Sequence, residues 1–226
     1  MDPLAVLAIA SIVFVGSHLA MSHPLRAPMV RVLGEKGFLP VYALVSLAAI
    51  VWMARAFQQV PPSVPLWPGF DDLSWAIASV LTLVAMVLLA GSFAGNPSLP
   101  APGAEAAARA EPRGVFTVTR HPMMWGIGLW AIAHIIAAPT GRTLVVAGAV
   151  GFLALAGAAL QDGKKARAMG DAWAQWASRT SYWPRMSALP GVGWRWWAIG
   201  TVLWLVASYG HIHAAGWAAG VWRWVG

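Results

Sequence analysis

The sequence predicts an all-α protein, a polytopic membrane bundle of about six transmembrane helices with an interfacial amphipathic helix before the last. Of the 226 residues, 59% are hydrophobic and only 10% are charged, whereas soluble domains carry about 25% charged residues. Six apolar segments each approach the roughly 20 residues that a helix needs to cross a bilayer. The positive charges also fall in alternate loops, which is typical of polytopic membrane proteins.

The six segments follow one another along the chain without an internal repeat, so we expect a single domain over residues 1–226. Each is about long enough to cross roughly 30 Å of hydrocarbon at about 1.5 Å per residue, and the fourth is the shortest. Asp2 stands where a signal peptide would carry basic residues, so we expect no cleaved signal peptide. The segments are Pro3–Ser22, Pro40–Phe57, Leu73–Ala94, Pro122–Ala138, Thr143–Leu160 and Trp196–Ala215.

The loops after the first, third and fifth segments hold twelve of the fifteen Lys and Arg residues. Positively charged loops stay in the cytoplasm, so both termini are predicted to lie outside. The net charge of +7 is explained by this asymmetry, and we expect no nucleic-acid partner because no soluble basic domain is present. The twelve residues are Arg26, Arg31, Lys36, Arg109, Arg113, Arg120, Lys164, Lys165, Arg167, Arg179, Arg185 and Arg195.

Two of these loops are long. Asn96–Thr119 is rich in proline and glycine, which predicts an irregular loop with one or two helical turns. In Gln161–Tyr182, apolar and basic residues alternate at helical spacing, with Trp173 and Trp176 on one side. This pattern predicts an amphipathic helix on the membrane surface, either a simple connector or a lid over a cavity that faces the cytoplasm.

The composition excludes several kinds of chemistry. The chain has no cysteine, which rules out disulfides, thiolate metal sites and cysteine nucleophiles. No acidic residue lies inside an apolar segment, and Asp162 stands at a boundary, so a carboxylate proton relay is not expected. The stretches Gly126-x-Gly128 and Gly148-x-x-Gly151 indicate close helix packing rather than phosphate binding.

The histidines in the apolar segments are the residues that most strongly indicate a functional site. Ionisable side chains are costly in hydrocarbon, so an intramembrane histidine predicts a functional site. Counting residues along the helices places His18 and His121 in an inner layer, and His134 with His211 or His213 in an outer layer. Imidazole is a common ligand of haem iron, and haem needs two axial imidazoles on facing helices beside an apolar slot.

Arg120 precedes His121 at the start of the fourth segment. One interpretation is a structural anchor whose guanidinium reaches the membrane surface. The other is an anion-binding group, since a guanidinium forks onto carboxylate or phosphate. A haem propionate or a nucleotide cofactor would suit this second role.

Particular motifs make the chain resemble the NnrU family over nearly its whole length. They are Gly16-Ser17-His18, Arg26, Leu33-Gly34-Glu35, Ser46-Leu47, Thr119-Arg120-His121-Pro122, Leu129-Trp130-Ala131 with Ala133-His134, and Thr180-Ser181-Tyr182-Trp183-Pro184. The resemblance implies a bacterial inner-membrane protein associated with nitrite and nitric oxide reduction. The plant 15-cis-zeta-carotene isomerase is similar and carries haem b.

The isomerase resemblance implies that His18 and His134 are the haem ligands, and so the metal-binding pair. The isomerase's cysteine near the second histidine matches Ala131 here, which argues against a cysteine ligand and against isomerase chemistry. The depths obtained by counting residues along the helices, in contrast, place His18 and His134 at different levels in the membrane and favour His134 with His211 as the pair. Helix tilt or a bend at Pro122 could bring His18 and His134 to the same level.

A second resemblance is to the isoprenylcysteine carboxyl methyltransferase family. The residues that carry it are Arg120-His121-Pro122, Gly126, Gly170, Trp173, Trp176, Thr180 and Pro184. It implies that Arg120, His121 and Gly126 would meet S-adenosylmethionine. Those enzymes have paired glutamates where this chain has Gln161 and Asp162, which weakens the expectation of methyl transfer.

Three hypotheses follow. The first is a haem-b-binding NnrU-like membrane protein in redox or nitrogen-oxide physiology, with a hydrophobic small-molecule substrate and a redox-enzyme partner. In it, Arg120 and His121 hold propionates or polar substrate groups. The second is an S-adenosylmethionine-dependent methyltransferase acting on a lipid-like substrate. The third is a non-catalytic assembly or maturation factor, and the sequence assigns no catalytic residue.

Overall fold

A computed structural model describes residues 1–99 and 102–225, and every regular element in this part of the chain is helical. Each of the six predicted apolar segments corresponds to a helix, which confirms the predicted all-α class. In order, the elements are α1 (Pro3–Ser22), α2 (Arg26–Gln59), α3 (Asp72–Gly91), α4 (Ala104–Arg109), η1 (Gly114–Thr117), α5 (Pro122–Ala137), α6 (Gly141–Met169), α7 (Asp171–Arg179), η2 (Met186–Val192), α8 (Trp194–Ala215) and α9 (Trp222–Val225).

Four helices within residues 1–99 and 102–225, namely α1, α2, α3 and α6, are long and apolar enough to cross a membrane. The chain is therefore a helical membrane protein. α5 is apolar but has only 16 residues. α8 has 22 residues, but its tryptophans and histidines lower its mean hydropathy. The two expected spans with the least support from length and hydropathy are thus α5 and α8, which carry His134 and His211.

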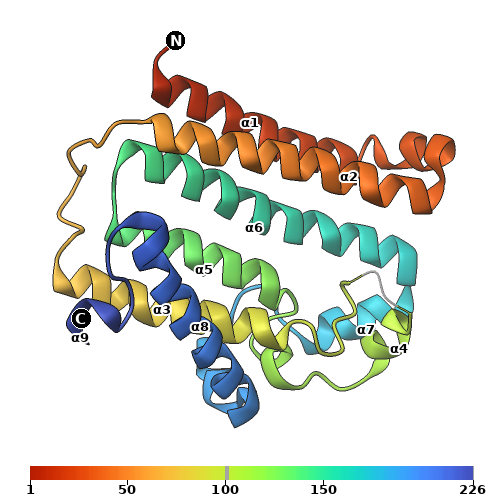
Figure 1. The fold of residues 1–226 in the computed structure, drawn as a ribbon. Coiled ribbons are helices and arrows are strands. Elements are labelled where there is room, and N and C mark those ends of the chain that lie inside the picture. Colours follow the sequence, from red (N-terminus) through yellow and green to blue (C-terminus); the bar gives the residue numbers. More distant parts are fainter. Residues whose placement is uncertain (100–101, 226) are drawn as a thin grey trace.

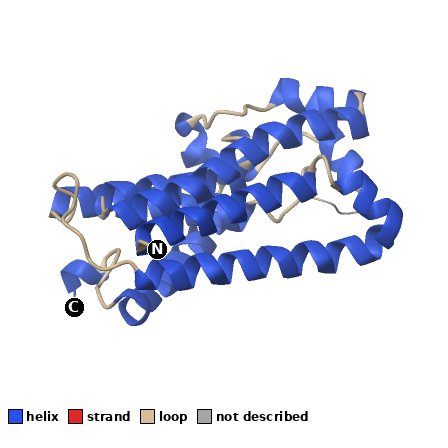
Figure 2. Cartoon of the chain, turned by 90° about the horizontal axis from the view of Figure 1, so that it is seen from above, coloured by secondary structure: helices blue, strands red, loops and turns tan. Residues whose placement is uncertain are grey.

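The long helices pack in a continuous order that differs from their order in the chain. α2 packs on α1, α1 on α6, α6 on α5, α5 on α3, and α3 on α8. Figure 1 shows α1 and α2 above α6, with α5 and α3 below it and α8 crossing at a steep angle. Loops join the helices mainly at the two ends of the bundle (Figure 2). The N-terminus and α9 lie toward one end, and α4 and α7 lie toward the other (Figure 1).

α2 begins earlier than the sequence predicts. It starts at Arg26 rather than Pro40, so Arg31 and Lys36 of the expected first basic loop are helical. Gly34 interrupts the helix with a φ of 68°, a conformation that glycine adopts without a Cβ clash. The ion pair between Arg26 and Glu35, at 2.9 Å, bridges this break.

The predictions for the two long loops, Asn96–Thr119 and Gln161–Tyr182, have different outcomes. α4 and η1 are the one or two helical turns predicted within Asn96–Thr119, of which Pro100 lies outside the described residues. The predicted surface helix over Gln161–Tyr182 is divided instead, because Gly170 turns the chain with a φ of 51° between α6 and α7. Trp173 and Trp176 are each 2% exposed and pack in the protein core, so α7 buries its tryptophan face within the protein.

Some glycines lie at close helix contacts, among them Gly126 of the predicted stretch Gly126-x-Gly128. A Cβ on Gly126 would lie 2.8 Å from the Ala85 carbonyl oxygen of α3. On α8, a Cβ on Gly200 would lie 2.7 Å from the Val87 Cα. Small residues let helix backbones approach in this way. Gly148 is different, because a Cβ there would meet no atom within 4 Å.

We expect Gly126→Ala to lower the thermal unfolding midpoint in detergent, because α5 and α3 would have to separate; overpacking of this kind costs about 1–3 kcal/mol. Gly148→Ala is the matched control and should leave the midpoint unchanged or raise it, since alanine is the better helix former. Equal midpoints for the two variants would contradict the proposed contact.

Candidate functional site

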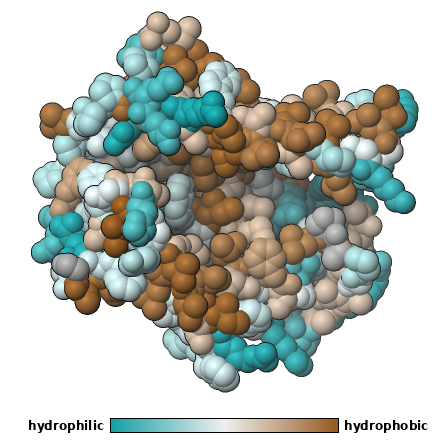
Figure 3. Space-filling model, in the orientation of Figure 1, coloured by the Kyte–Doolittle hydropathy of each residue, from teal (hydrophilic) through white to brown (hydrophobic). Residues whose placement is uncertain are grey.

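A large cavity of about 740 Å³ lies among α2, α3, α5, α6 and α8. Its walls are mostly apolar and aromatic, with Trp75, Trp130 and Trp204 among them. Apolar side chains also surround the hollow in the middle of the face shown in Figure 3. Small-molecule and cofactor sites are typically apolar cavities of about 300–1,000 Å³ with a few polar groups, so this cavity is the main candidate site.

Two of the predicted site histidines line this cavity together. His134 on α5 and His211 on α8 have ring centroids 6.4 Å apart. The Nδ1 of His134 donates to the Trp130 carbonyl oxygen at 2.8 Å, and the Nδ1 of His211 points to the Trp217 carbonyl oxygen at 3.4 Å. A carbonyl oxygen only accepts, so the ring proton belongs on Nδ1. In the neutral imidazole this leaves the Nε2 lone pair of each ring free to bind a metal.

His18 lies elsewhere. It is half-buried on α1, and its Nδ1 donates to the Phe14 carbonyl oxygen at 2.8 Å. Its ring packs edge-on against Tyr42 of α2, with centroids 5.6 Å apart, and it is not among the residues that line the large cavity. The structure therefore places the His134 ring next to His211 rather than next to His18. His213 is exposed, and its ring lies beside that of Tyr209.

Arg120 and His121 form a separate cluster with Asp162, at the start of α5 and far along α6. The Arg120 Nε lies 3.0 and 2.9 Å from the two Asp162 carboxylate oxygens, and an Nη2 hydrogen bond to Asp162 completes a fork. The His121 Nε2 donates to Asp162 Oδ1 at 2.7 Å. One carboxylate thus neutralises the Arg120 guanidinium and orients the His121 ring, which stabilises the buried charge.

Residues 181–185 tie this cluster to the rest of the bundle. The Arg120 backbone N–H donates to the Ser181 carbonyl at 2.8 Å, and the Trp125 indole donates to the Tyr182 carbonyl at 2.8 Å. The Tyr182 hydroxyl donates to the Leu155 carbonyl at 2.7 Å. Burial, and then the nearby Asp162 carboxylate, raise the pKa of Tyr182, so this hydroxyl keeps its proton and its hydrogen bond at neutral pH.

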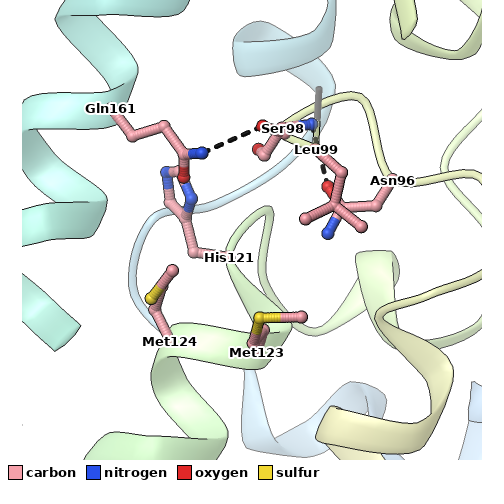
Figure 4. Close-up of a pocket in the computed structure, with 7 residues that line it drawn as sticks. All are labelled: Asn96, Ser98, Leu99, His121, Met123, Met124 and Gln161. Atoms are coloured by element: carbon pink, nitrogen blue, oxygen red, sulfur yellow. Dashed lines mark hydrogen bonds between the residues drawn. The ribbon is translucent and has the colours of Figure 1, made fainter. Parts of the chain in front are cut away.

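A small cavity of about 20 Å³ adjoins the cluster (Figure 4). His121 is only 2% exposed, and neither its Nδ1 nor the Ser98 Oγ, both buried, has a hydrogen-bond partner among the described residues. Gln161 donates to the Ser98 carbonyl at 2.9 Å across the same space. A cavity of this size holds about one water molecule, far less than a nucleotide cofactor needs. The lining residues are Asn96, Ser98, Leu99, His121, Met123, Met124 and Gln161.

Sequence reasoning identified Arg120 and His121 but missed their partner. From the sequence, Asp162 is only an acidic residue at the boundary of an apolar segment, with no predicted partner. A usable signal existed, because Asp162 stands two residues after the apolar segment Thr143–Leu160, at the same predicted membrane face as Arg120 and His121. Within residues 1–99 and 102–225, no three His, Cys, Asp or Glu side chains gather as a metal site.

Among the described residues, four helices long and apolar enough to cross a membrane place the chain in the class of helical membrane proteins, and an apolar cavity lined by two histidines lies between its helices. More particularly, the chain belongs to the NnrU family, since the family model described as NnrU protein matches residues 6–219. The predicted family is thereby confirmed. No curated protein and no solved structure matches the chain, so the similarities to the isomerase and the methyltransferase stay predictions.

We expect Asp162→Asn to destabilise the protein by about 2–4 kcal/mol, because it leaves the mostly buried Arg120 and His121 without their carboxylate. The midpoint of thermal unfolding in detergent measures this loss. The control is Glu105→Gln, which breaks the exposed pair with Arg109 and should cost less than about 0.5 kcal/mol. A loss for Asp162→Asn as small as that of the control would refute the structural role of the cluster.

Proposed function

We propose that this NnrU protein binds haem b in the large cavity, with His134 and His211 as the axial ligands. The observation that carries the proposal is the His134–His211 pair, whose rings are 6.4 Å apart on the cavity wall. Both Nδ1 atoms are directed to backbone carbonyls. Such contacts fix the tautomer and orientation of metal-bound histidines.

The separation of the rings suits two imidazoles on one metal ion. The ring centroids are 6.4 Å apart and the ring planes are tilted by 48°, so both imidazoles border the same part of the cavity. The two residues also come from different helices, α5 and α8, both of which pack on α3. Ligands on facing helices of a bundle are a common arrangement for cofactors.

The cavity supports the same proposal. Its volume of about 740 Å³ and its tryptophans suit a flat, apolar macrocycle. Bound haem would supply electron-transfer or gas-binding chemistry. The protein's own contribution is to hold the group, to orient the two imidazoles through Trp130 and Trp217, and to exclude water with apolar walls.

The cellular role follows from the family and the charge pattern. We infer a bacterial inner-membrane location with both termini in the periplasm, because twelve of the fifteen basic residues fall in the three stretches of chain assigned to the cytoplasm. The role is in redox or nitrogen-oxide physiology. It involves either a redox-enzyme partner or an apolar small molecule that reaches the cavity from the membrane.

At the other end of the bundle, the Arg120 Nε and Nη2 and the His121 Nε2 donate to the Asp162 carboxylate. This pairing favours a structural role for both residues over contact with S-adenosylmethionine or a propionate. Methyl transfer and a non-catalytic maturation role are therefore the alternatives that the haem experiment also tests.

We expect protein purified in detergent from haem-replete cells to show a sharp Soret band and, after reduction, split α and β bands. His134→Ala and His211→Ala should each abolish or shift these bands, because each removes one axial ligand. His213→Ala is the matched control on α8 and should leave the spectrum unchanged.

His18→Ala separates the two ligand assignments. An unchanged spectrum supports the His134–His211 pair, whereas loss of the bands in His18→Ala together with an unchanged His211→Ala spectrum would favour the pair implied by the isomerase. A featureless wild-type spectrum would remove haem altogether, and calorimetry with S-adenosylmethionine on wild type and His121→Ala would then test methyl transfer.

A further inference from the structure

The large cavity has one permanently charged side chain in its lining. Among its described lining residues, Arg142 is the single Arg or Lys, and none is Asp or Glu. The remaining wall is apolar, aromatic or neutral polar, apart from the two histidines. The electrostatic potential inside the cavity therefore has a fixed positive source, which favours a ligand with an anionic group.

Arg142 has hydrogen-bonding capacity to spare. Its Nη1 donates to the Val60 carbonyl oxygen at 3.2 Å, and its guanidinium lies over the Phe57 ring, 4.8 Å from the centroid. No ion pair is formed by Arg142 with any described residue. A guanidinium carries five N–H donors in a planar fork, so most of them are available to a carboxylate.

The neighbours of Arg142 make this end of the cavity polar. Gln58 follows Phe57 on α2, and Thr140 and Thr143 flank Arg142 at the start of α6; all three line the cavity. The two threonine hydroxyls are hydrogen-bonded to each other at 2.9 Å. The cavity thus combines an apolar, aromatic body with a cationic, hydrogen-bonding end, the complement of an amphiphile with an acidic head.

We propose that Arg142 binds the carboxylate of the cavity's ligand, so that the ligand is an apolar molecule with an acidic end. This inference rests on the proposed function where the ligand is haem, because the propionates of haem would then be the carboxylates that Arg142 binds. A lipid carboxylate has the same chemistry, and the experiment separates the two sources. Arg142 is a ligand-binding residue in this assignment, and His134 and His211 remain the metal ligands.

The test removes the charge from the protein and from the ligand in turn. Wild-type apoprotein in detergent is titrated with haem and with haem dimethyl ester, and binding is followed by the Soret band. We expect wild type to prefer haem about tenfold, since a guanidinium–carboxylate fork is a strong charge-assisted contact. Arg142→Gln should bind both forms equally, mainly by losing affinity for haem.

Two variants control for indirect effects. Arg55→Gln removes the same charge from the exposed α2 residue Arg55, outside the cavity lining, and should keep the full preference. Arg142→Lys keeps the charge but loses the fork, and should keep a reduced preference even if Arg142→Gln fails to fold. An unchanged preference in Arg142→Gln, or no preference in wild type, would overturn the assignment.

Failure of the haem proposal is recognised separately. If wild type binds neither haem nor its ester, the fluorescent fatty acid cis-parinaric acid and its methyl ester are titrated instead. A preference for the free acid that Arg142→Gln abolishes would identify a lipid carboxylate as the ligand of the same site. Absence of any preference for the acid would overturn the anion site itself.

Discussion

The arrangement of this protein depends on one carboxylate, that of Asp162, which is shared by Arg120 and His121. These contacts fix the start of α5 against α6, and the backbone hydrogen bond from Arg120 to Ser181 adds the segment before η2. His134 lies thirteen residues further along α5, or about 20 Å at 1.5 Å per residue. Arg142 lies at the opposite end of α6. The distant cavity therefore depends on how firmly this cluster holds the two helices together.

The cavity itself combines three requirements for an amphiphilic cofactor. Its walls supply apolar and aromatic surface, and two imidazoles whose Nδ1 atoms contact backbone carbonyls line the space from α5 and α8. Arg142 adds a positive charge at the polar end. Among the tryptophans and histidines of α8, Trp204 and His211 line the cavity.

Helices were the part of the structure most accessible from sequence, because hydropathy and length report directly on membrane-crossing segments. The packing role of Gly126 was likewise predictable, since small residues allow close helix approach. The helical start of α2 was not, because its charged residues resemble a loop, and a single glycine with positive φ accommodates the break. The turn at Gly170 and the burial of Trp173 arise from tertiary packing that an amphipathic pattern does not reveal. The pairing of the histidines is not predictable from the sequence for a similar reason. Counting residues along a helix gives the depth of each histidine in the membrane, whereas the rotation and tilt of the helices decide which rings meet.

The central claim is that two imidazoles from α5 and α8 bind one haem iron. It is tested most directly by the low-temperature electron paramagnetic resonance spectrum of the oxidised wild-type protein. The structure predicts a low-spin ferric signal of the bis-imidazole type, because each ring offers its Nε2 lone pair. A high-spin signal would mean that one of the two ligands is missing, and a protein without a ferric haem signal after haem-replete expression would contradict the account.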